Sequence, residues 1–246
     1  MIDHNSAGQS NSLPITGERT VPGIWHENYW FRRHQAVYAA ILDGLAGARV
    51  LEAGCGEGYG AAMLAAGGAE RVVAFDYDAA ATVHARLSYP DLVVVGGNLV
   101  ALPFGDDTYD AVVSLQTIEH LWDQAAFVDE CRRVLRPHGR LILSTPNRLT
   151  FPPGNLFHAR ELSPDELVGL VRRHGRLESL RGVRHGPRLD AWELRHGSIV
   201  DAHLAAAPDA WPSALVAQVG AVGVDDFVLS SDDLDGCLDL VATVRL

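Results

Sequence analysis

Apolar residues recur along the chain with two different spacings. Between Trp25 and Leu45, apolar and aromatic residues recur at helical spacing, which predicts an amphipathic helix. After it, short runs rich in Val, Leu and Ile alternate with helix-like stretches. Strands that are apolar on both sides indicate a parallel sheet covered by helices on both faces. The predicted strands are Arg49–Ala53, Arg71–Phe75, Leu92–Val95, Ala111–Leu115 and Leu141–Ser144, and the predicted helices between them include Gly60–Ala66, Asp78–Leu87 and Gln124–Leu135.

After the fifth predicted strand the pattern is less regular. Ser163 is a good helix N-cap, followed by Pro164 and, three residues after the cap, by Glu166. A helix is therefore predicted to begin there, to run to about His174 and to stop at Gly175. The Pro- and Ala-rich stretch 203–219 is also expected to be helical.

The last two apolar runs, Asp226–Leu229 and Leu238–Val244, are typical of strands. Only the short polar connection Ser230–Gly236 separates them, and a parallel pair would need a longer crossover, so they are predicted to pair antiparallel. The chain as a whole is predicted to be one α/β domain over residues 1–246. Its doubly wound sheet has seven strands, mostly parallel, and closes with this antiparallel C-terminal hairpin.

Composition and charge narrow the class of function. The formal net charge is −11 and the pI about 5.4, which disfavours a polyanionic partner such as nucleic acid. All 20 basic residues are Arg, so chemistry that needs a Lys, such as a Schiff base or a phosphate-binding loop lysine, is excluded. The 3 cysteines form no CxxC pair, and no run is long enough to cross a membrane, so we expect a cytoplasmic protein without a zinc site or disulfide framework.

A glycine-rich turn follows the first predicted strand, with Gly54, Gly56 and Gly58 at alternate positions. Glycine permits positive φ and lets a ligand approach the backbone, and in open α/β sheets ligands bind at the carboxyl ends of the strands. A dinucleotide pattern GxGxxG counted from Gly54 fails, because its third glycine would fall at Tyr59. Glu52, two residues before Gly54, would repel a pyrophosphate but suits a cationic amino acid group.

This arrangement, acid-x-Gly-x-Gly-x-Gly after a strand, resembles the signature of class I methyltransferases that use S-adenosylmethionine (SAM). The resemblance implies a Rossmann-like methyltransferase sheet, SAM as cofactor and S-adenosylhomocysteine as product. Glu52, Ala53, Gly54, Cys55, Gly56 and Gly58 are then expected to bind the cofactor. The domain would divide into an N-terminal arm and helix over the site (1–45), a SAM-binding half (46–150) and an acceptor-side half with the C-terminal hairpin (151–246).

Further cofactor contacts are expected at the next strand ends. Asp76 ends the second strand, 24 residues after Glu52, where an acid can accept hydrogen bonds from two ribose hydroxyls. The alternative is a helix N-cap, a role that we expect for Asp78. By resemblance, Tyr77 would lie against the adenine ring. Asn98 and Leu99 would also hold adenine, although the family usually has Asp where Asn98 stands.

Three more residues complete the expected cofactor site. By resemblance, Gln116 at the end of the fourth strand should border the methionine part of the cofactor. In the N-terminal segment, Arg33 or Arg19 could pair with the cofactor carboxylate in a bidentate way, and Tyr29 could close over the methionine chain. The alternative for this segment is a helix that packs its aromatic rings on the sheet.

Methyl transfer to a hydroxyl needs a base, and His is the side chain best poised near neutral pH. His120 lies where the methyl group should point, with Glu119 beside it to orient the site, although this pair is also explained as architecture. His158, in a loop that resembles one of sugar-acting methyltransferases, is the second candidate. No metal is predicted, because the neutral amide of Gln116 is a weak ligand for a hard cation.

A wider resemblance spans nearly the whole chain, through GERTVP, ENYWFRRHQAVY, IEHLWDQ, STPNR and FHARELSPDEL. It is similar to actinobacterial methyltransferases assigned to the synthesis of 6-O-methylglucose lipopolysaccharide. This implies an oligosaccharide acceptor methylated on a primary hydroxyl. The alternatives are a natural-product or other small-molecule O-methyltransferase, a non-catalytic module that binds SAM or its product, and an oxidoreductase, which the glycine spacing opposes. The sequence leaves a homodimer open.

Overall fold

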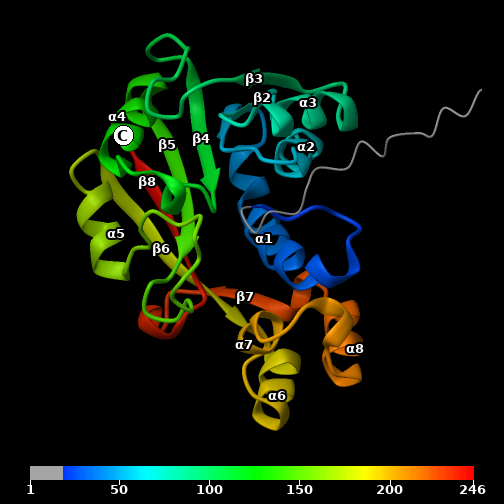
Figure 1. Cartoon of the computed structure of the whole chain (residues 1–246). Helices are drawn as coiled ribbons and strands as arrows, with labels where there is room; N and C mark the ends of the chain where they lie inside the picture. The colour runs from blue at the N-terminus through cyan, green and yellow to red at the C-terminus, as the bar shows by residue number, and fades with distance from the viewer. Residues whose placement is uncertain (1–18) are drawn as a thin grey trace, which may run out of the picture.

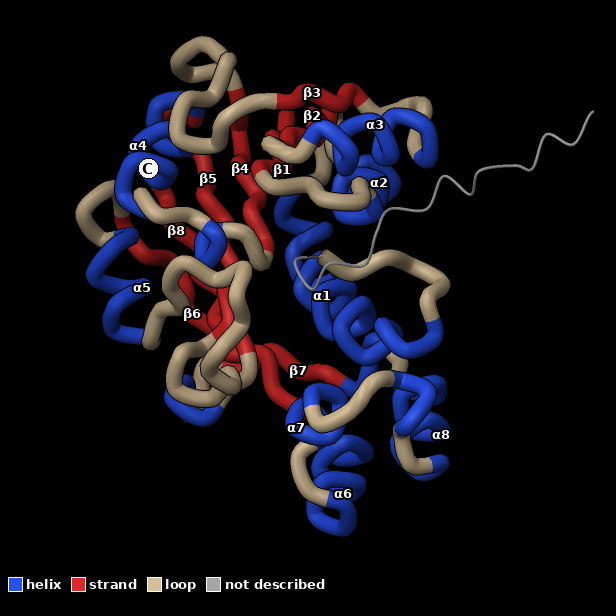
Figure 2. Tube along the Cα trace, in the orientation of Figure 1, coloured by secondary structure: helices blue, strands red, loops and turns tan. Residues whose placement is uncertain are grey.

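A computed structural model describes residues 19–246, so most of the predicted N-terminal arm lies outside the described residues. The described chain forms an eight-stranded sheet in the order β3-β2-β1-β4-β5-β8-β6-β7 (Figures 1 and 2). The strands are β1 Arg49–Ala53, β2 Arg71–Asp76, β3 Val93–Gly96, β4 Tyr109–Leu115, β5 Leu135–Pro146, β6 Arg176–His185, β7 Phe227–Ser230 and β8 Asp239–Arg245. The helices are α1 Asn28–Ile41, α2 Tyr59–Ala66, α3 Ala79–Ser88, α4 Gln124–Val134, α5 Pro164–Val171, α6 Pro187–His196, α7 Ile199–Leu204 and α8 Ser213–Ala221.

Helices cover both faces of the sheet, as the doubly apolar strands predict. Successive residues of a strand point to opposite faces, so Val50 and Leu51 of β1 belong to different buried clusters. The cluster around Val50 packs α1, α2 and α3 together with α6, α7 and α8. The cluster around Leu51 packs α4 and α5. The strands β1 to β5 pair in parallel, which confirms that part of the prediction.

The C-terminal part of the sheet differs from the expected hairpin. β8 lies between β5 and β6 and is antiparallel to both, while β7 pairs with the far edge of β6. The strands β7 and β8 are therefore not paired with each other, and the predicted hairpin is wrong. The reason is β6, which the sequence pattern did not reveal and which occupies the place between them. The sheet consequently has eight strands and not seven.

Local capping signals were predicted well. Ser163 caps α5 by accepting from the Glu166 backbone N–H, and the Glu166 carboxylate accepts in return from the Ser163 N–H. Asp78 caps α3 by accepting from the backbone N–H of Ala80. These side chains satisfy helix donors that would otherwise lack partners, so a short sequence window is enough to locate them. The helix α5 ends at Val171, a little earlier than predicted.

Candidate functional site

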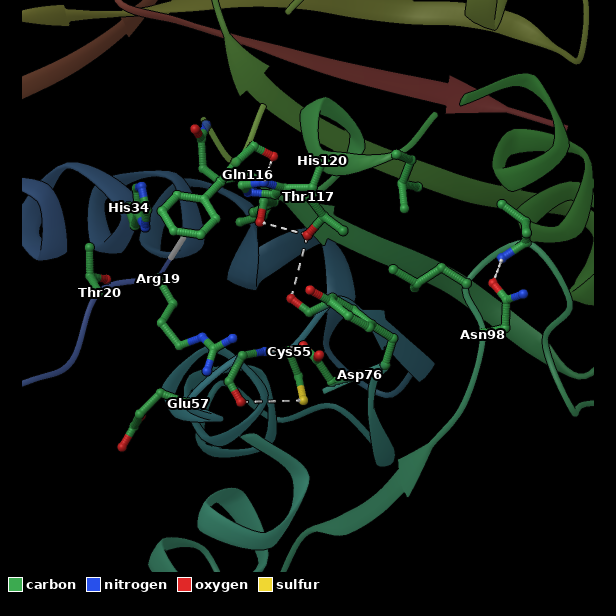
Figure 3. Close-up of a pocket in the computed structure, with 18 of the residues that line it drawn as sticks. Arg19, Thr20, His34, Cys55, Glu57, Asp76, Asn98, Gln116, Thr117 and His120 are labelled. Atoms are coloured by element: carbon green, nitrogen blue, oxygen red, sulfur yellow. Dashed lines mark hydrogen bonds between the residues drawn. The ribbon is translucent and has the colours of Figure 1, made fainter. Parts of the chain in front are cut away.

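A cavity of about 810 Å³ opens at the carboxyl ends of the parallel strands, where the strand order reverses between β1 and β4 (Figure 3). Such switch points are the usual ligand crevices of open α/β sheets. Nine of the predicted site residues line this cavity. They are Gly54, Cys55, Gly56, Asp76, Tyr77, Asn98, Leu99, Gln116 and His120.

The glycine turn has the backbone that was expected from its sequence. Gly54, Gly56 and Gly58 have φ of 89°, 51° and 101°, in the left-handed region that favours glycine. A Cβ atom at Gly54 would collide with the side chain of Thr117, so this glycine permits the close approach of the segment after β4. Gly58 instead packs against Ala85 and lies outside the wall of the cavity.

Glu52 and Ala53 are fully buried and do not line the cavity. The Tyr38 hydroxyl, which does line it, donates to Glu52 Oε1, so the carboxyl group acts on the site through Tyr38. Burial raises the pKa of Glu52 to about 8, and its Oε2 has no hydrogen-bond partner among residues 19–246. A Cβ atom at Gly60 would collide with both Glu52 and Tyr38. The direct contact predicted for Glu52 is therefore corrected to an indirect one.

Asp76 ties the glycine turn to the end of β2. Its Oδ2 accepts from the Gly56 N–H at 2.7 Å and its Oδ1 from the Asp78 N–H at 2.9 Å. Burial raises the pKa of this carboxyl, while the two backbone N–H groups oppose the rise. A carboxylate offers about four lone-pair positions, so two remain for vicinal hydroxyls.

The end of the cavity beyond Asp76 is formed by Tyr77, Asn98 and Leu99. Tyr77 is exposed, whereas Leu99 is buried and presents an apolar wall. The Asn98 Oδ1 atom accepts from the Val100 N–H at 3.0 Å, so the oxygen expected to accept from adenine already has one donor. A carbonyl oxygen can accept twice, so one lone pair remains for the predicted contact.

Gln116 has a φ of 52°, which is unusual for a residue other than glycine. Its backbone N–H and its side-chain amide both donate to Ser144 on β5, and these bonds hold the conformation. Gln116 lines the first cavity and also a second one, of about 690 Å³. Strained backbone held by its surroundings is concentrated at functional sites.

The second cavity adjoins the first and shares part of its wall. Both are lined by Arg19, Thr20, His34, Gln116, His120, Leu156 and Phe157. The second cavity has a polar end, at which Glu119, His120 and His158 meet, and aromatic walls that include Trp30, Phe151 and Trp211. A ligand in the first cavity and another in the second would therefore meet near Gln116 and His120.

The three predicted catalytic residues are brought together although they come from two separate segments. Their candidate ligand or proton-accepting atoms all lie within 4.8 Å of one another, and the rings of His120 and His158 are 5.1 Å apart. Glu119 accepts from the Thr145 hydroxyl at 3.0 Å, and burial raises its pKa to about 8. Its backbone oxygen accepts from the N–H groups of Ala159 and Arg160, which draws the loop inward.

Both histidines have a defined tautomer when neutral. His120 Nδ1 lies 3.0 Å from the carbonyl oxygen of Phe157, which can only accept, so Nδ1 holds the hydrogen and Nε2 the lone pair. His158 Nδ1 lies 2.7 Å from the Glu161 carboxylate, and its Nε2 lies 3.0 Å from the Asn155 side-chain nitrogen. His158 is therefore bonded on both sides by its own loop.

Two predicted cofactor residues have other partners. Tyr29 is fully buried, bonds His185 through its hydroxyl at 2.7 Å and lines neither cavity. Arg33 forms a buried bidentate pair with Asp239 at the start of β8, and it lines the second cavity only. Their expected cofactor contacts are thus replaced by packing between α1 and the C-terminal strands. Arg19, the other candidate, lines both cavities and pairs with Asp78 at 2.7 Å.

His34 is a site residue that the sequence analysis missed. It lines both cavities, and its Nδ1 lies 3.1 Å from the Tyr59 hydroxyl, which in turn contacts Thr20. Burial lowers the pKa of His34 to about 4, so this imidazole is neutral at physiological pH. Its spacing from Trp30 places both on one face of α1, and that helical pattern is the signal that could have identified it.

These residues fit SAM in chemical character. The first cavity offers an acid for a diol, an apolar wall for a flat ring and a turn whose backbone is accessible. Its opening into the second cavity suits an acceptor that must approach the methyl group from outside the cofactor. An arrangement of this kind aligns a nucleophile with an activated donor, which is the main task in such a displacement.

Comparison with known proteins agrees with this chemistry. Residues 51–143 match the family described as "Methyltransferase domain". A "Probable S-adenosylmethionine-dependent methyltransferase" of Mycolicibacterium smegmatis is 50% identical over 94% of this chain and 95% of its own. A "Ubiquinone biosynthesis O-methyltransferase" of Cereibacter sphaeroides is 30% identical over 60% of this chain and 68% of its own. The crystal structure of a SAM-dependent methyltransferase from Mesorhizobium loti superposes with a TM-score of 0.61, at 16% identity over 87% of this chain and 98% of that one. The chain belongs to the SAM-dependent methyltransferases.

Proposed function

We propose that this methyltransferase acts on a sugar hydroxyl, and specifically on the 6-hydroxyl of glucose in an α-glucan type of oligosaccharide or polysaccharide. The observation that supports it most is the second cavity, which joins the cofactor cavity at Gln116 and His120 and has one polar end within aromatic walls. Aromatic faces pack against the C–H faces of sugar rings, and polar side chains bind their hydroxyls. The resemblance to methyltransferases of methylglucose lipopolysaccharide synthesis gives the regiochemistry.

In this proposal, the residues around the first cavity hold the cofactor. Asp76 accepts from the ribose hydroxyls, Tyr77, Asn98 and Leu99 hold adenine, and the turn from Gly54 to Gly56 lies against the methionine part. Glu52, Ala53 and Gly58 support that turn from behind. When bound, SAM supplies a methyl group whose transfer to oxygen leaves the electron pair on sulfur and yields S-adenosylhomocysteine.

His120 is proposed as the general base. Its Nε2 lone pair, set by the hydrogen bond from Nδ1 to the Phe157 carbonyl, takes the proton of the acceptor hydroxyl as the new C–O bond forms. Glu119 is protonated below its pKa of about 8 and lines the second cavity. Its proposed role is to donate a hydrogen bond to an oxygen of the methyl acceptor. His158, whose ring lies 5.1 Å from that of His120, helps to position the acceptor.

The test is transfer of radiolabelled methyl groups to a panel of glucosides, from methyl glucoside to partly methylated oligosaccharides, with linkage analysis of the product. Methylation at O6 is the expected result. A small aromatic acceptor is the second candidate, since aromatic walls also accommodate an aromatic ring and one relative is named as a ubiquinone biosynthesis O-methyltransferase. Cofactor binding without transfer to any acceptor would instead favour a non-catalytic module.

Metal dependence is tested separately. We propose that no metal is needed, because Gln116 is neutral and the carboxyl group of Glu119 is already held by Thr145. Glu119, His120 and His158 nevertheless offer atoms close enough for one ion to bridge. Turnover that survives dialysis against a chelator supports the proposal, and activity lost on chelation and restored by Mg²⁺ or Zn²⁺ contradicts it.

We also propose a cytoplasmic location, in keeping with three buried, free cysteines. None of the helices formed by residues 19–246 has the length and apolar character that a membrane span requires. Whether the protein forms a homodimer is tested by its mass in solution, measured by light scattering.

A further inference from the structure

The second cavity has a second polar position, formed by residues other than the proposed catalytic ones. His26 and Glu27 near the start of α1 line it, as do His203 on α7 and the nearby Trp211. The rings of Trp211 and His203 are 4.6 Å apart, and the ring of Trp30 lies 5.9 Å from His203. An imidazole is thus held between two indole rings in the wall of the cavity.

His203 has an unused hydrogen-bond acceptor. Its Nδ1 lies 2.7 Å from the Ile199 carbonyl oxygen, which can only accept, so the hydrogen is on Nδ1 and the lone pair on Nε2. The residue is only 7% exposed, and Nε2 has no hydrogen-bond partner among the described residues. Buried polar atoms are normally satisfied, and one that is not calls for an explanation such as an absent ligand.

We infer that Trp30, Trp211 and His203 form a subsite for a neutral sugar ring next to the unit that is methylated, with a ring hydroxyl that donates to His203 Nε2. This inference rests on the proposed function and deepens it, because it names the residues that bind the second sugar unit of the oligosaccharide. One unit presents its hydroxyl to His120, and the adjoining unit packs against the wall that Trp30 and Trp211 form on either side of His203. A cavity of about 690 Å³ lies in the range of about 300–1,000 Å³ that holds drug-sized ligands.

The chemistry of the subsite favours a ligand that carries hydroxyl groups, such as a sugar, over one that has none. The lone pair on His203 needs a donor, which a hydroxyl supplies and a quinone carbonyl or a hydrocarbon does not. Burial lowers the pKa of His203, so the side chain stays neutral and does not attract an anion. His26 and Glu27 add polar groups beside the rings, and their side chains lie 3.5 Å from each other. Flat apolar faces with polar groups at their edges match the two sides of a pyranose ring.

The experiment compares a glucose oligosaccharide with methyl glucoside as acceptors, using His203→Phe. This variant keeps a ring for packing but removes the acceptor atom. Loss of one neutral hydrogen bond is expected to raise KM for the oligosaccharide by about three- to tenfold. The kcat, the affinity for SAM and the KM for methyl glucoside should be unchanged. Calorimetry with the product-bound protein, without turnover, should show the same weakening for the oligosaccharide alone.

Two further variants act as controls. His203→Gln retains an acceptor oxygen and should keep the oligosaccharide KM within about twofold of the native value. His196→Phe changes a histidine that stacks on Trp192 outside both cavities, and should have no effect. If His203→Phe does not fold, Trp211→Phe replaces it, because that change shrinks the wall and leaves His203 in place; it too should raise KM for the oligosaccharide alone.

The outcomes separate this inference from the proposed function. If native protein methylates both acceptors but His203→Phe alters neither KM, the subsite is wrong and the sugar activity stands. If KM rises equally for both acceptors, His203 contacts the reacting unit and the subsite is again wrong. If native protein methylates no glucoside, the proposed function fails and the subsite falls with it.

Discussion

The two cavities of this enzyme are built in different ways. The first cavity, proposed to hold the cofactor and called the cofactor cavity below, is formed mainly by strand ends. Its key contacts are between backbone and nearby side chains, as in the bonds from Gly56 and Asp78 to Asp76. The second cavity, proposed to hold the acceptor and called the acceptor cavity below, is assembled from α1, the segment after β4, the loop around His158 and the segment after α7. Local chemistry therefore determines the first, whereas tertiary packing determines the second.

The largest effect that tests this comparison is expected at the junction. His120→Ala should lower kcat by about 10²–10⁴, because the proposed acceptor, a sugar hydroxyl, needs a base at neutral pH. The affinity for SAM should hardly change. His158→Ala is the matched control and should mainly raise the acceptor KM. Steady-state kinetics measure kcat and KM, and calorimetry measures the affinity for SAM. Near-native turnover of His120→Ala would show that another residue is the base.

The next largest effect concerns the cofactor cavity alone. Asp76→Ala should weaken SAM binding by roughly tenfold or more, since hydrogen bonds to a charged group contribute about 1.5–3 kcal/mol. The change also removes the acceptors of the Gly56 and Asp78 N–H groups, so the turn should loosen. Asp76→Asn, which keeps an oxygen, should lose less. Unchanged affinity in a folded Asp76→Ala protein would remove this residue from the ribose role.

Gly54→Ala tests the turn itself. At a φ of 89°, a side chain is strained by about 1–3 kcal/mol, and its Cβ would also collide with Thr117. We expect a lower Tm together with weaker SAM binding. The sequence predicts that Gly54 is needed to leave space for a ligand, and the structure shows that it also leaves space for the Thr117 side chain. A variant of native Tm and native affinity would show that neither explanation holds.

The smallest effect concerns Glu52, which supports the turn from below. Its pKa of about 8 lies above the ordinary value of 4.5. Between these two pH values the carboxyl group is therefore protonated in the folded state and ionised in the unfolded state. Stability from this group is present below about pH 4.5 and is lost as the pH rises towards 8. Glu52→Gln should remove this loss and give a higher Tm than native protein at pH 8. A steeper pH dependence in Glu52→Gln would contradict this account of the buried acid.

The same contrast explains what the sequence could predict. The positions of the parallel strands along the chain, the cap at Asp78 and the capping box at Ser163 follow from residues close together in the sequence, and their prediction was correct. The pairing of β8 with β6, the burial of Tyr29 and the partner of Arg33 depend on contacts between distant segments. Periodicity contains no information about which distant segment packs against an element, so the sequence could not predict those contacts.

His158 is intermediate between features set by local sequence and features set by contacts between distant segments. Its sequence context singled it out, but its position beside His120 requires the loop to fold inward through the Glu119 backbone oxygen. No local pattern specifies that contact. The separate roles predicted for the two histidines therefore stay predictions until the kinetics are measured.

The insertion of β8 between β5 and β6 has a consequence for the order of folding. The parallel half from β1 to β4 can form from a continuous stretch of chain, whereas β5 and β6 remain without their common neighbour until residues 239–245 have been synthesised. Arg33 likewise cannot form its ion pair until Asp239, 206 residues further along the chain, has been synthesised. Contacts of such long separation add loop-closure entropy to the folding barrier. On the ribosome, the cofactor half is thus expected to become protease-resistant first, and the acceptor cavity should appear last.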